Sequence, residues 1–510
     1  MMGRLRKLTS DEEEVRNEGG LPPNVRLAEE GGRTVVYTTH KTSDAGTIVA
    51  RQDFDPVVAH HYRPAGIGND IPIYTGKFSL APDLNVEHEG DIHFTWNPTP
   101  RLIARGGANR SIIDDIFGAA GDPTEAPKWT RMGDVHVDTS LGIPPQPSGE
   151  PSIWDKGITN SWMEDRIASP DVGEGDDLDS LTFLIPNGWQ SIGGTRVRDR
   201  EKPWVWWDGG IRVQAAGWAL TLDPIASLSR KYWQQLAASG TSDVTHVGRL
   251  TRVDASRFSA ADAEKPCNAI RLAISLALGR SVQCLLPVGW QESKAVWAKW
   301  HCGGVDRMRN VHALLDETEA VDQLEQIVAR CLDFTADEYR EEVLQYAISY
   351  YLTASYDVNV ELAVALPVSA LQLLAFSRFV EIRGVESKGS WEALSTGQQI
   401  RRLLNDCSVP LGIPAHFTHF QGVASILGPM SDGSPRDALQ CLIKMRNDII
   451  HPTRDKATRW TAYQWAEASE IALDYLRFAI LNTIGYSGRI RSAAQESKYL
   501  GSLTEVPWAP

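Results

Sequence analysis

The sequence predicts an α+β protein, with a large β-rich N-terminal region followed by an all-α C-terminal bundle of about five helices. Two patterns lead to this prediction. Short β-prone runs bounded by turn residues recur up to about residue 320, and from about residue 330 apolar residues recur at helical spacing. The length of 510 residues and the 42% of hydrophobic residues are typical of a globular protein with more than one domain.

Charge, cysteine content and hydropathy limit the class of protein. The formal net charge is −14, so any contact with RNA must be made by a local basic patch rather than by the whole surface. The six cysteines are scattered without a C-x-x-C pair, which argues against a disulfide framework. Met1–Glu14 lacks the apolar run of a signal peptide, and Leu362–Phe376 is short for a membrane span and contains Pro367. We therefore expect a cytoplasmic protein that does not enter a membrane.

The N-terminal half is predicted to contain a tail and a β-rich region. Residues 1–33 are polar and charged, which favours a flexible tail. Residues 34–325 form the β-rich α+β region, with a possible subdivision near residue 225. Its β-prone runs are Thr34–Thr38, Ile92–Trp96, Leu181–Ile185, Trp204–Trp207 and Ile211–Ala215. Helical segments interrupt these runs at Ile225–Ala238 and Ala269–Leu278.

Turn residues and tryptophans give two further expectations for this region. Asp208-Gly209 lies between two β-prone runs and predicts a hairpin turn, and residues 118–180, rich in Pro, Gly and Asp, predict loops. Thirteen of the 17 tryptophans precede residue 301. They could form a base-stacking or sugar-binding surface, or they could fill the core and loop corners of a β-rich domain. The composition favours the core.

Residues 330–490 are predicted to form the helical bundle, and residues 491–510 a C-terminal extension. Thr335 and Glu338 predict a capping box at the start of the first helix, and Thr396 and Gln399 a second box at the third. The second helix, about 359–383, is apolar nearly all round and should be central.

The last two predicted helices lie on either side of the polar segment Arg446–His451 and its following proline. Ser434-Pro435 is predicted to open the fourth helix, and Pro452 to stop it. The fifth helix is expected from about Thr458 to Thr483.

The segment Arg446-Asn447-Asp448-Ile449-Ile450-His451 ends the fourth helix. Asn447 lies one turn before His451 and could orient its ring. Arg446 lies on an apolar row of the helix, where a permanently charged guanidinium needs a partner or an anionic ligand. Arg446 and His451 are about 140° apart on an ideal helix. They could meet at one phosphate only if Pro452 unwinds the last turn or if two subunits share the site.

This segment resembles the motif of the HEPN superfamily (higher eukaryotes and prokaryotes nucleotide-binding). The family motif is an Arg, often followed by a polar residue, then a His after four to six intervening residues, late in a helical bundle. Arg446, Asn447 and His451 match this motif, and the resemblance covers about 160 of the 510 residues. The chain also resembles prokaryotic and phage proteins that join a large N-terminal region to such a bundle.

The resemblance implies RNA cleavage without a metal or other cofactor. The 2′-OH next to the scissile phosphate would be the nucleophile, His451 would transfer protons, and Arg446 would hold the phosphate oxygens. The products would be a 2′,3′-cyclic phosphate and a 5′-OH. The resemblance further implies a homodimer with the motif of both chains at the site. It also implies a role as an antiviral abortive-infection effector, a toxin restrained by the N-terminal region until a phage-derived or nucleotide trigger appears.

The basic residues around the motif are the expected RNA contacts. Between residues 436 and 459, six basic residues stand against three acidic ones, a local excess of +3. The candidates for contact with RNA are Lys444, Arg454, Lys456 and Arg459.

Other interpretations stay open at this point. Arg446 could pair structurally with Glu361 or Glu381, and His451 could cap a helix end. The bundle would then be a non-catalytic nucleotide- or partner-binding dimerisation module, or an unrelated bundle, attached to a ligand-recognition domain.

Candidate metal ligands are incomplete in the sequence. His416 and His419 lack further ligands at zinc spacing, as do His60 and His61, so no metal is expected. The acidic run at 174–179 is interpreted as a solvated loop, because it lacks the spacing of a calcium-binding loop.

Overall fold

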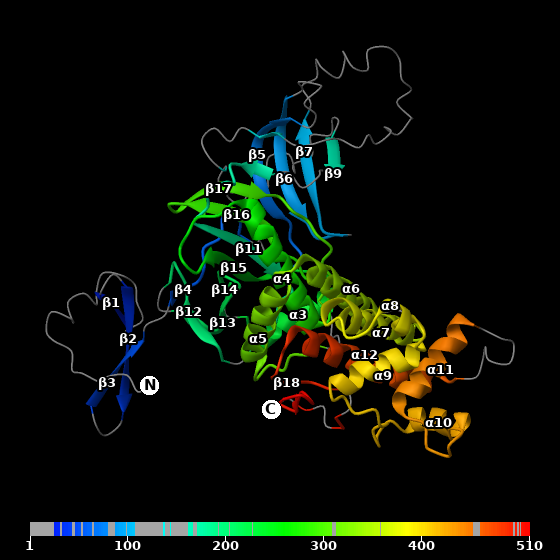
Figure 1. Ribbon diagram of the computed structural model, residues 1–510. Helices are drawn as coiled ribbons and strands as arrows, with labels where there is room; N and C mark the ends of the chain where they lie inside the picture. Colours follow the sequence, from blue (N-terminus) through cyan, green and yellow to red (C-terminus); the bar gives the residue numbers. More distant parts are fainter. Residues whose placement is uncertain are drawn as a thin grey trace, which may run out of the picture.

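The computed structural model describes residues 25–30, 33–42, 46–52, 55–63, 66–79, 87–97, 99–107, 136–137, 143, 162–166, 171–191, 193–202, 205–226, 228–308, 313–356, 359–451, 460–492, 495–496, 499 and 501–509. The protein is mixed α and β, with a β-rich region followed by a helical region (Figure 1). This arrangement is consistent with the α+β class expected from the sequence. Most of the expected loop region 118–180 and residues 1–24 of the expected tail lie outside the described residues.

A nine-stranded sheet is the centre of the β-rich region. Its strands, in spatial order, are β10 (Asp171–Gly173), β17 (Lys294–Lys299), β16 (Leu285–Gln291), β11 (Ser180–Pro186), β15 (Val244–Arg252), β14 (Trp218–Pro224), β13 (Trp206–Ala215), β12 (Thr195–Arg198) and β4 (Asp55–Pro56). β14 and β15 pair directly, so the subdivision that we expected near residue 225 falls inside this sheet.

The predicted hairpin turn at Asp208-Gly209 is wrong, because β13 runs unbroken through it. Thr195 pairs with Gly210 and Val197 with Trp207, so β13 carries one extra residue at this place, which is a β-bulge. Gly209 has a φ of +113°, which explains the glycine. The hairpin turn lies instead at Ala216-Gly217, whose φ angles of 50° and 78° are those of a type I′ turn.

Two smaller sheets lie in the described part of the N-terminal half. One has five strands in the order β8 (His136–Val137), β5 (Ile71–Ser79), β6 (Glu87–Thr95), β7 (Arg101–Gly107) and β9 (Trp162–Arg166). The other has three strands, β1 (Val25–Glu30), β2 (Arg33–Thr42) and β3 (Gly46–Gln52). β1 thus lies within the stretch that we expected to be a tail.

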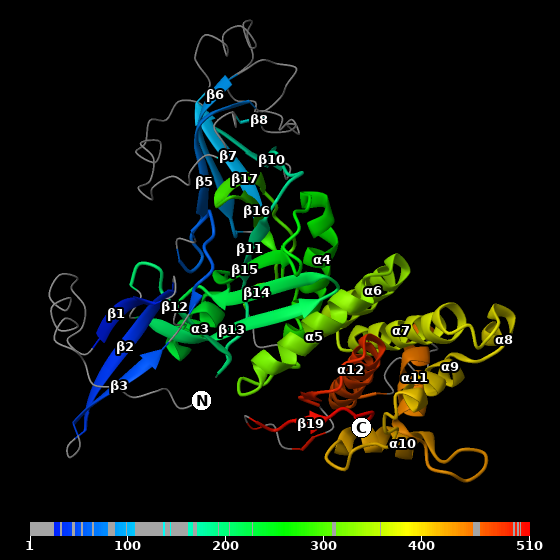
Figure 2. The same cartoon turned by 60° about the vertical axis from the view of Figure 1, so that its left-hand side comes forward.

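The two faces of the nine-stranded sheet are covered differently (Figure 2). On one face, strand residues such as Phe183 and Leu250 share a core with helices α4 (Ala260–Leu278) and α5 (Ala320–Phe334). On the other face, Leu184 and Val247 share a smaller core with residues of the five-stranded sheet. Helix α3 (Arg230–Ser239) contributes Trp233 to the buried residues.

Most tryptophans of the described β-rich region are core residues, which favours the packing interpretation of the Trp content. The buried ones are Trp96, Trp189, Trp207, Trp218, Trp233, Trp297 and Trp300. Trp206, by contrast, is 39% exposed.

The C-terminal region is a bundle, and its described residues form six helices of ten residues or more. They are α6 (Glu338–Ser355), α7 (Leu362–Phe376), α9 (Thr396–Asp406), α10 (Thr418–Leu427), α11 (Ala438–Ile450) and α12 (Ala462–Ile484). The short helix α8 (Lys388–Glu392) and the π-helical turns η4 (Ser377–Ile382) lie between α7 and α9. The expected count of about five omitted α10, whose short apolar pattern we did not assign.

Helix α7 with η4, Leu362–Ile382, is long and apolar enough to cross a membrane by composition alone. It packs against α6, α9, α11 and α12, and much of its surface is buried by them. This agrees with the central core helix expected from its all-round apolar character.

The expected helix starts are displaced by a few residues. The N-caps are Asp337 for α6, Ser395 for α9, Asp437 for α11 and Thr461 for α12, whereas we expected caps at Thr335, Thr396 and Ser434 and a helix start at about Thr458. In each, the side chain accepts the amide N–H three residues on. Thr335 instead ends α5, where its hydroxyl donates to the Cys331 carbonyl at 2.9 Å.

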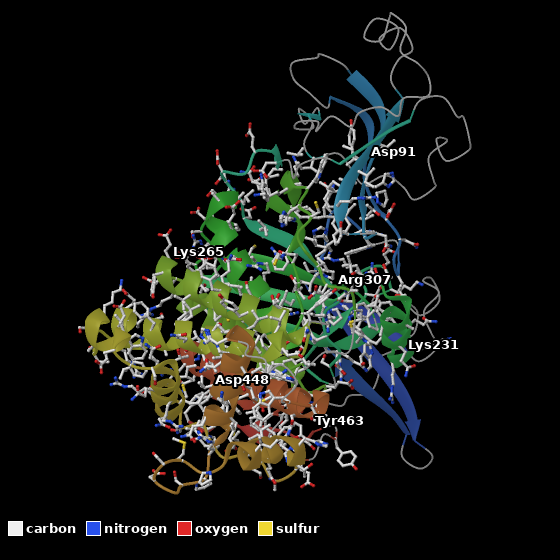
Figure 3. The ribbon with its side chains drawn as sticks, turned by 90° about the vertical axis from the view of Figure 1, so that its right-hand side faces the viewer. Asp91, Lys231, Lys265, Arg307, Asp448 and Tyr463 are labelled. Atoms are coloured by element: carbon white, nitrogen blue, oxygen red, sulfur yellow. The ribbon has the colours of Figure 1, made fainter. Side chains whose placement is uncertain are left out.

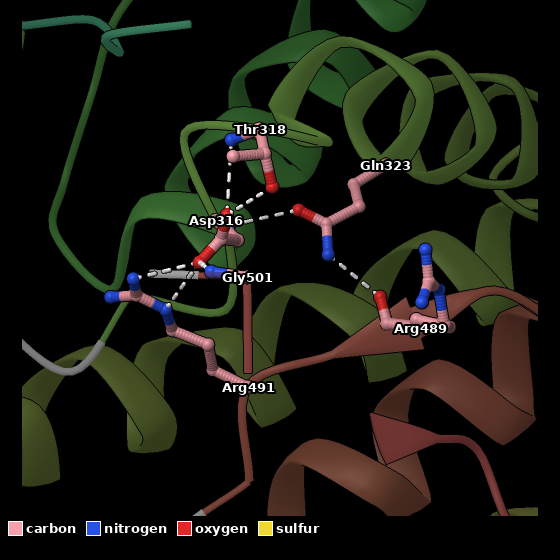
Figure 4. Close-up of polar contacts among 6 residues, drawn as sticks. All are labelled: Asp316, Thr318, Gln323, Arg489, Arg491 and Gly501. Carbon is pink, nitrogen blue, oxygen red and sulfur yellow. Dashed lines mark hydrogen bonds and ion pairs between the residues drawn. The ribbon is translucent and has the colours of Figure 1, made fainter. Parts of the chain in front are cut away.

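The C-terminal extension folds back onto the start of α5 (Figure 4). β18 (Arg489–Ile490) pairs with β19 (Thr504–Glu505). The buried Asp316 carboxylate accepts hydrogen bonds from the Thr318 amide and hydroxyl, the Gly501 amide and the Arg491 guanidinium. The extension is therefore joined to the rest of the chain by an ion pair between the buried Asp316 carboxylate and the partly exposed Arg491.

Candidate functional site

Helix α11 carries the predicted motif, and its local sequence explains where it begins and ends. Asp437 and Gln440 form a reciprocal capping box at its start. The helix ends at Ile450, and His451 is the C-cap residue with φ −123° and ψ 66°. Pro452 follows directly, and a residue before proline is disfavoured in the helical conformation.

Arg446 is half-buried on α11 and poorly satisfied. Its Nη1 donates to the adjacent Asn447 Oδ1 at 3.2 Å, whereas its buried Nε has no hydrogen-bond partner. Within the described part of the chain, no carboxylate lies within 4.0 Å of Arg446, so neither Glu361 nor Glu381 forms the structural pair considered above. The guanidinium therefore retains an unmet need for an acceptor.

Asn447 does not play the role expected from its spacing. Its side-chain oxygen accepts from Arg446, and its main-chain carbonyl accepts from the His451 amide at 2.9 Å. The structure gives no hydrogen bond between the Asn447 side chain and the His451 ring among the described residues. Asn447 thus orients the guanidinium rather than the imidazole. Helical spacing brings positions 447 and 451 together but does not decide which neighbour the amide chooses.

The His451 ring is exposed at the end of α11. The hydrogen bond from His451 N–H to the Asn447 carbonyl keeps the last turn helical up to that residue. The unwinding that would bring Arg446 and His451 together within one chain is therefore not present. A single chain presents the two side chains to different sides of α11.

Of the four expected RNA contacts, only Lys444 is described. Its Nζ donates to Asp448 Oδ1 at 2.6 Å, and the Asp448 carboxylate also accepts from Trp460 Nε1 at 3.2 Å. Asp448 is buried between α11 and the start of α12, while Tyr463 projects from α12 into solvent (Figure 3). Lys444 therefore neutralises a buried carboxylate. Arg454, Lys456 and Arg459 lie outside the described residues.

The histidines considered as metal ligands have other surroundings. Among the described residues, no three His, Cys, Asp or Glu side chains are grouped to hold a metal. Both ring nitrogens of His60 contact main-chain carbonyls, those of Tyr62 and Leu286, and burial lowers the pKa of His60 to about 4. The exposed His419 ring stacks on Tyr463 with centroids 5.0 Å apart.

A second candidate site was missed by sequence reasoning. A cavity of about 620 Å³ opens on the nine-stranded sheet, with Arg200, Arg212 and Arg249 in its wall. Arg212 and Arg249 each lie between non-polar neighbours in a β-prone run. A charged residue at such a position could have indicated the site from the sequence. The arginines come from separate strands, and only the pairing of these strands in the sheet brings them together, so the cluster was not recognised.

Comparison with known proteins divides the chain at the same places as the fold. Residues 173–311 match the model of the YopA central domain family, and residues 337–503 match that of the YopA C-terminal domain. The chain is similar to a prophage protein. That relative, the SPbeta prophage-derived uncharacterized protein YopA of Bacillus subtilis (strain 168), is 23% identical over 450 residues, which cover 87% of this chain and 96% of the relative. No solved structure matches the chain.

The YopA central-domain match covers the strands from β11 to β17, and the C-terminal match covers the bundle and part of the extension. Neither family description names an activity. Functional inference therefore depends on the geometry of the two candidate sites.

Proposed function

We propose that the C-terminal bundle is a metal-independent endoribonuclease of the HEPN type, with Arg446 and His451 as its catalytic residues. The observation that carries this proposal is the unsatisfied guanidinium of Arg446, five residues before an exposed histidine. A half-buried arginine without a carboxylate partner is an unfavourable arrangement unless an anion completes it. A phosphodiester supplies paired oxygen acceptors that match a guanidinium.

In the proposed reaction, the imidazole of His451 accepts the proton of the ribose 2′-OH or donates one to the departing 5′ oxygen, and water carries out the other proton transfer. The 2′ oxygen bonds to phosphorus as the phosphorus–5′-oxygen bond breaks, which leaves a 2′,3′-cyclic phosphate and a 5′-OH. Arg446 neutralises the extra negative charge on the phosphate oxygens in the transition state. Asn447 is a positioning residue, because it contacts the guanidinium and not the reacting atoms.

The proposed site is shared between two chains. Arg446 and His451 diverge around α11, so a symmetric pair of helices would bring the Arg of one chain to the His of the other. Ile450 and Tyr463, near the motif, are 44% and 69% exposed and offer apolar surface for such a partner. A homodimer through this end of the bundle would bring Arg446 and His451 of different chains together and would cover the exposed apolar side chains.

The proposed context is cytoplasmic, phage-encoded or prokaryotic defence, with the β-rich region sensing a trigger. The prophage origin of the relative is compatible with this context.

Cleavage of a labelled RNA in EDTA tests the proposal. Wild-type protein should produce cyclic-phosphate ends, and Arg446→Ala and His451→Ala should each reduce the rate by at least about 100-fold, as expected for the loss of a transition-state contact or a proton-transfer group. Circular dichroism should show that both variants keep their helical content.

Arg330→Ala is the matched control for the loss of an arginine, because Arg330 is exposed and lies on α5, outside the α11 motif. This variant should cleave at the wild-type rate. Equal cleavage by wild type, Arg446→Ala and His451→Ala would refute the proposal, as would the absence of cleavage in the wild-type dimer under activating conditions. In that case the bundle would act as a binding or dimerisation module.

A further inference from the structure

The cavity on the nine-stranded sheet is built by one row of residues across four adjacent strands. Arg212 on β13 pairs with Thr221 on β14, Thr221 with Arg249 on β15, and Arg249 with Thr182 on β11. Residues directly opposite one another in a sheet point to the same face. The row therefore presents two guanidinium groups and two hydroxyls to the same space, and Arg200 from beyond β12 lines it as well.

The three arginines differ in the hydrogen bonds and ion pairs that their side chains already form within the protein. Arg212 Nη1 donates to the buried Asp223 carboxylate at 2.7 Å. Arg200 Nε donates to the Val57 carbonyl at 2.6 Å, an uncharged acceptor. Arg249 is exposed, and its side chain makes no hydrogen bond or ion pair with the described residues.

Each carboxylate that lines the same cavity pairs with an arginine, although Asp179 and Glu292 share theirs with Asp177. Asp223 is paired with Arg212 and also accepts from the Val58 amide at 3.1 Å. Asp179 and Glu292, at the opposite end, both pair with Arg257, at 3.2 and 3.6 Å. Among the described residues, neither Arg200 nor Arg249 forms an ion pair with a carboxylate within 4.0 Å. Burial, and then the charges of Arg249 and Arg198, lower the pKa of Arg200, and the charge of Asp223 offsets only part of this effect.

The side of the cavity formed by Trp290 indicates which chemical group could bind beside the phosphate. Trp290 lies in the cavity wall with its indole N–H bonded to Thr182 Oγ1 at 2.8 Å, which fixes the ring in place. A fixed indole offers a flat apolar surface for a base or a sugar. The volume of about 620 Å³ lies in the range of pockets for ligands the size of a nucleotide and is far larger than a single phosphate needs.

We propose that this cavity binds a nucleoside phosphate, with the phosphate groups between Arg200 and Arg249 and the nucleoside against Trp290. The proposal does not depend on the nuclease, because the cavity and α11 lie in different parts of the fold. Hydroxyl groups of Thr182 and Thr221 would add hydrogen bonds to the phosphate oxygens. Asp179 and Glu292 would face the donor groups of the nucleoside.

Calorimetric titration of the full chain with ATP, ADP, adenosine and inorganic phosphate tests the proposal. ATP or ADP should bind, and adenosine and phosphate alone should each bind at least about tenfold more weakly, because each fills only one end of the cavity. Arg249→Gln and Arg200→Gln should each weaken nucleotide binding by about tenfold or more, as expected for a lost charge-assisted hydrogen bond.

Arg230→Gln is the control, since Arg230 is an exposed arginine at the start of α3 outside the cavity. It should bind nucleotide as the wild type does. The proposal is overturned if no nucleotide binds at millimolar concentration, or if Arg249→Gln and Arg200→Gln bind as tightly as wild type. Binding of adenosine as tight as that of ATP would also overturn it.

Discussion

The guanidinium of Arg446 is a single charged group that is expected to lower the stability of the folded chain. The sequence indicated its odd position, because Arg446 falls on an apolar row of α11. The sequence could not indicate its contact with Asn447, since helical spacing does not determine side-chain rotamers. The consequence is a charged group whose buried Nε is unsatisfied in the folded chain.

We expect Arg446→Met to stabilise the protein while it abolishes RNA cleavage. Methionine has a similar length, keeps the apolar contacts and removes the unsatisfied charge, so the free energy of unfolding should rise by about 1 kcal/mol. Urea denaturation followed by circular dichroism measures this change. A destabilisation of similar size would mean that the guanidinium has a structural role.

Lys444→Met on the same helix should have the opposite effect. Lys444 neutralises Asp448, which is almost fully buried, so its loss leaves a buried carboxylate that keeps the hydrogen bond from the Trp460 indole but lacks the positive charge of the lysine. Because Lys444 is itself 34% exposed, the free energy of unfolding should fall by about 1–3 kcal/mol, less than for the loss of a fully buried ion pair. The same urea denaturation should separate the two variants, and Lys444→Met together with Asp448→Asn should recover part of the loss.

Asp316 gives a pH-dependent prediction. Burial raises the pKa of its carboxyl, but hydrogen bonds from Thr318, Gly501 and Arg491 lower it more, to about 2. A folded-state pKa below the unfolded value stabilises the fold above about pH 4, by about 2 kcal/mol, and this stability is lost as the pH falls towards 2. Asp316→Asn should therefore be less stable than wild type at neutral pH, and the difference should shrink below about pH 4.

Urea denaturation at several pH values measures this difference. Asp333→Asn, an exposed position on α5, serves as the control and should follow the wild type throughout. A difference between Asp316→Asn and wild type that stays constant down to about pH 2 would contradict the assigned role.

At the scale of elements, the sequence predicted long helices well because their apolar rows repeat over several turns. Helix starts were displaced, since several Ser, Thr and Asp residues near each start could serve as caps and local contacts select one of them. The Asp208-Gly209 pair was read as a turn because a left-handed glycine suits both a turn and a bulge. Only the pairing with β12 distinguishes the two.

The turn and the bulge respond differently to substitution. Ala216 has a φ of 50° in the Ala216-Gly217 turn, which is unfavourable for alanine, so Ala216→Asn should stabilise the protein by about 0.5–1 kcal/mol. Gly209→Ala should destabilise it, because φ is +113° and a Cβ would lie 2.9 Å from Ser191 Oγ and 3.0 Å from Pro224 Cγ. Thermal unfolding of the two variants measures both effects, and an unfavourable effect of Ala216→Asn would contradict the strain assigned to Ala216.

At the scale of the whole molecule, the sequence predicted the succession of a β-rich and a helical region but not the order of strands in the sheets. β4 joins a sheet whose other strands begin at residue 171, and β16 and β17 join it after the long helix α4. Such pairings depend on contacts between distant segments, which a periodic pattern does not encode. The cavity that we propose as a nucleotide site was missed for this reason, whereas the α11 motif lies within one helix and could be found.

If two chains share the site, two inactive variants should restore RNA cleavage when they form a mixed dimer. Arg446→Ala lacks the arginine but keeps His451, and His451→Ala lacks the histidine but keeps Arg446. In a dimer of the two variants, one of the two sites takes both intact residues and the other takes neither. Random mixing should therefore restore about a quarter of the wild-type rate, because half of the dimers are mixed and each has one complete site.

Co-expression of the two variants with different tags, followed by purification of the mixed dimer, allows this to be measured directly. The mixed dimer should cleave RNA at about half the wild-type rate, whereas each variant alone should be inactive. An inactive mixed dimer would mean that Arg446 and His451 of the same chain act together. Since α11 remains helical up to His451, those two side chains would then have to reach one phosphate from different sides of the helix, and the last turn would have to unwind when RNA binds.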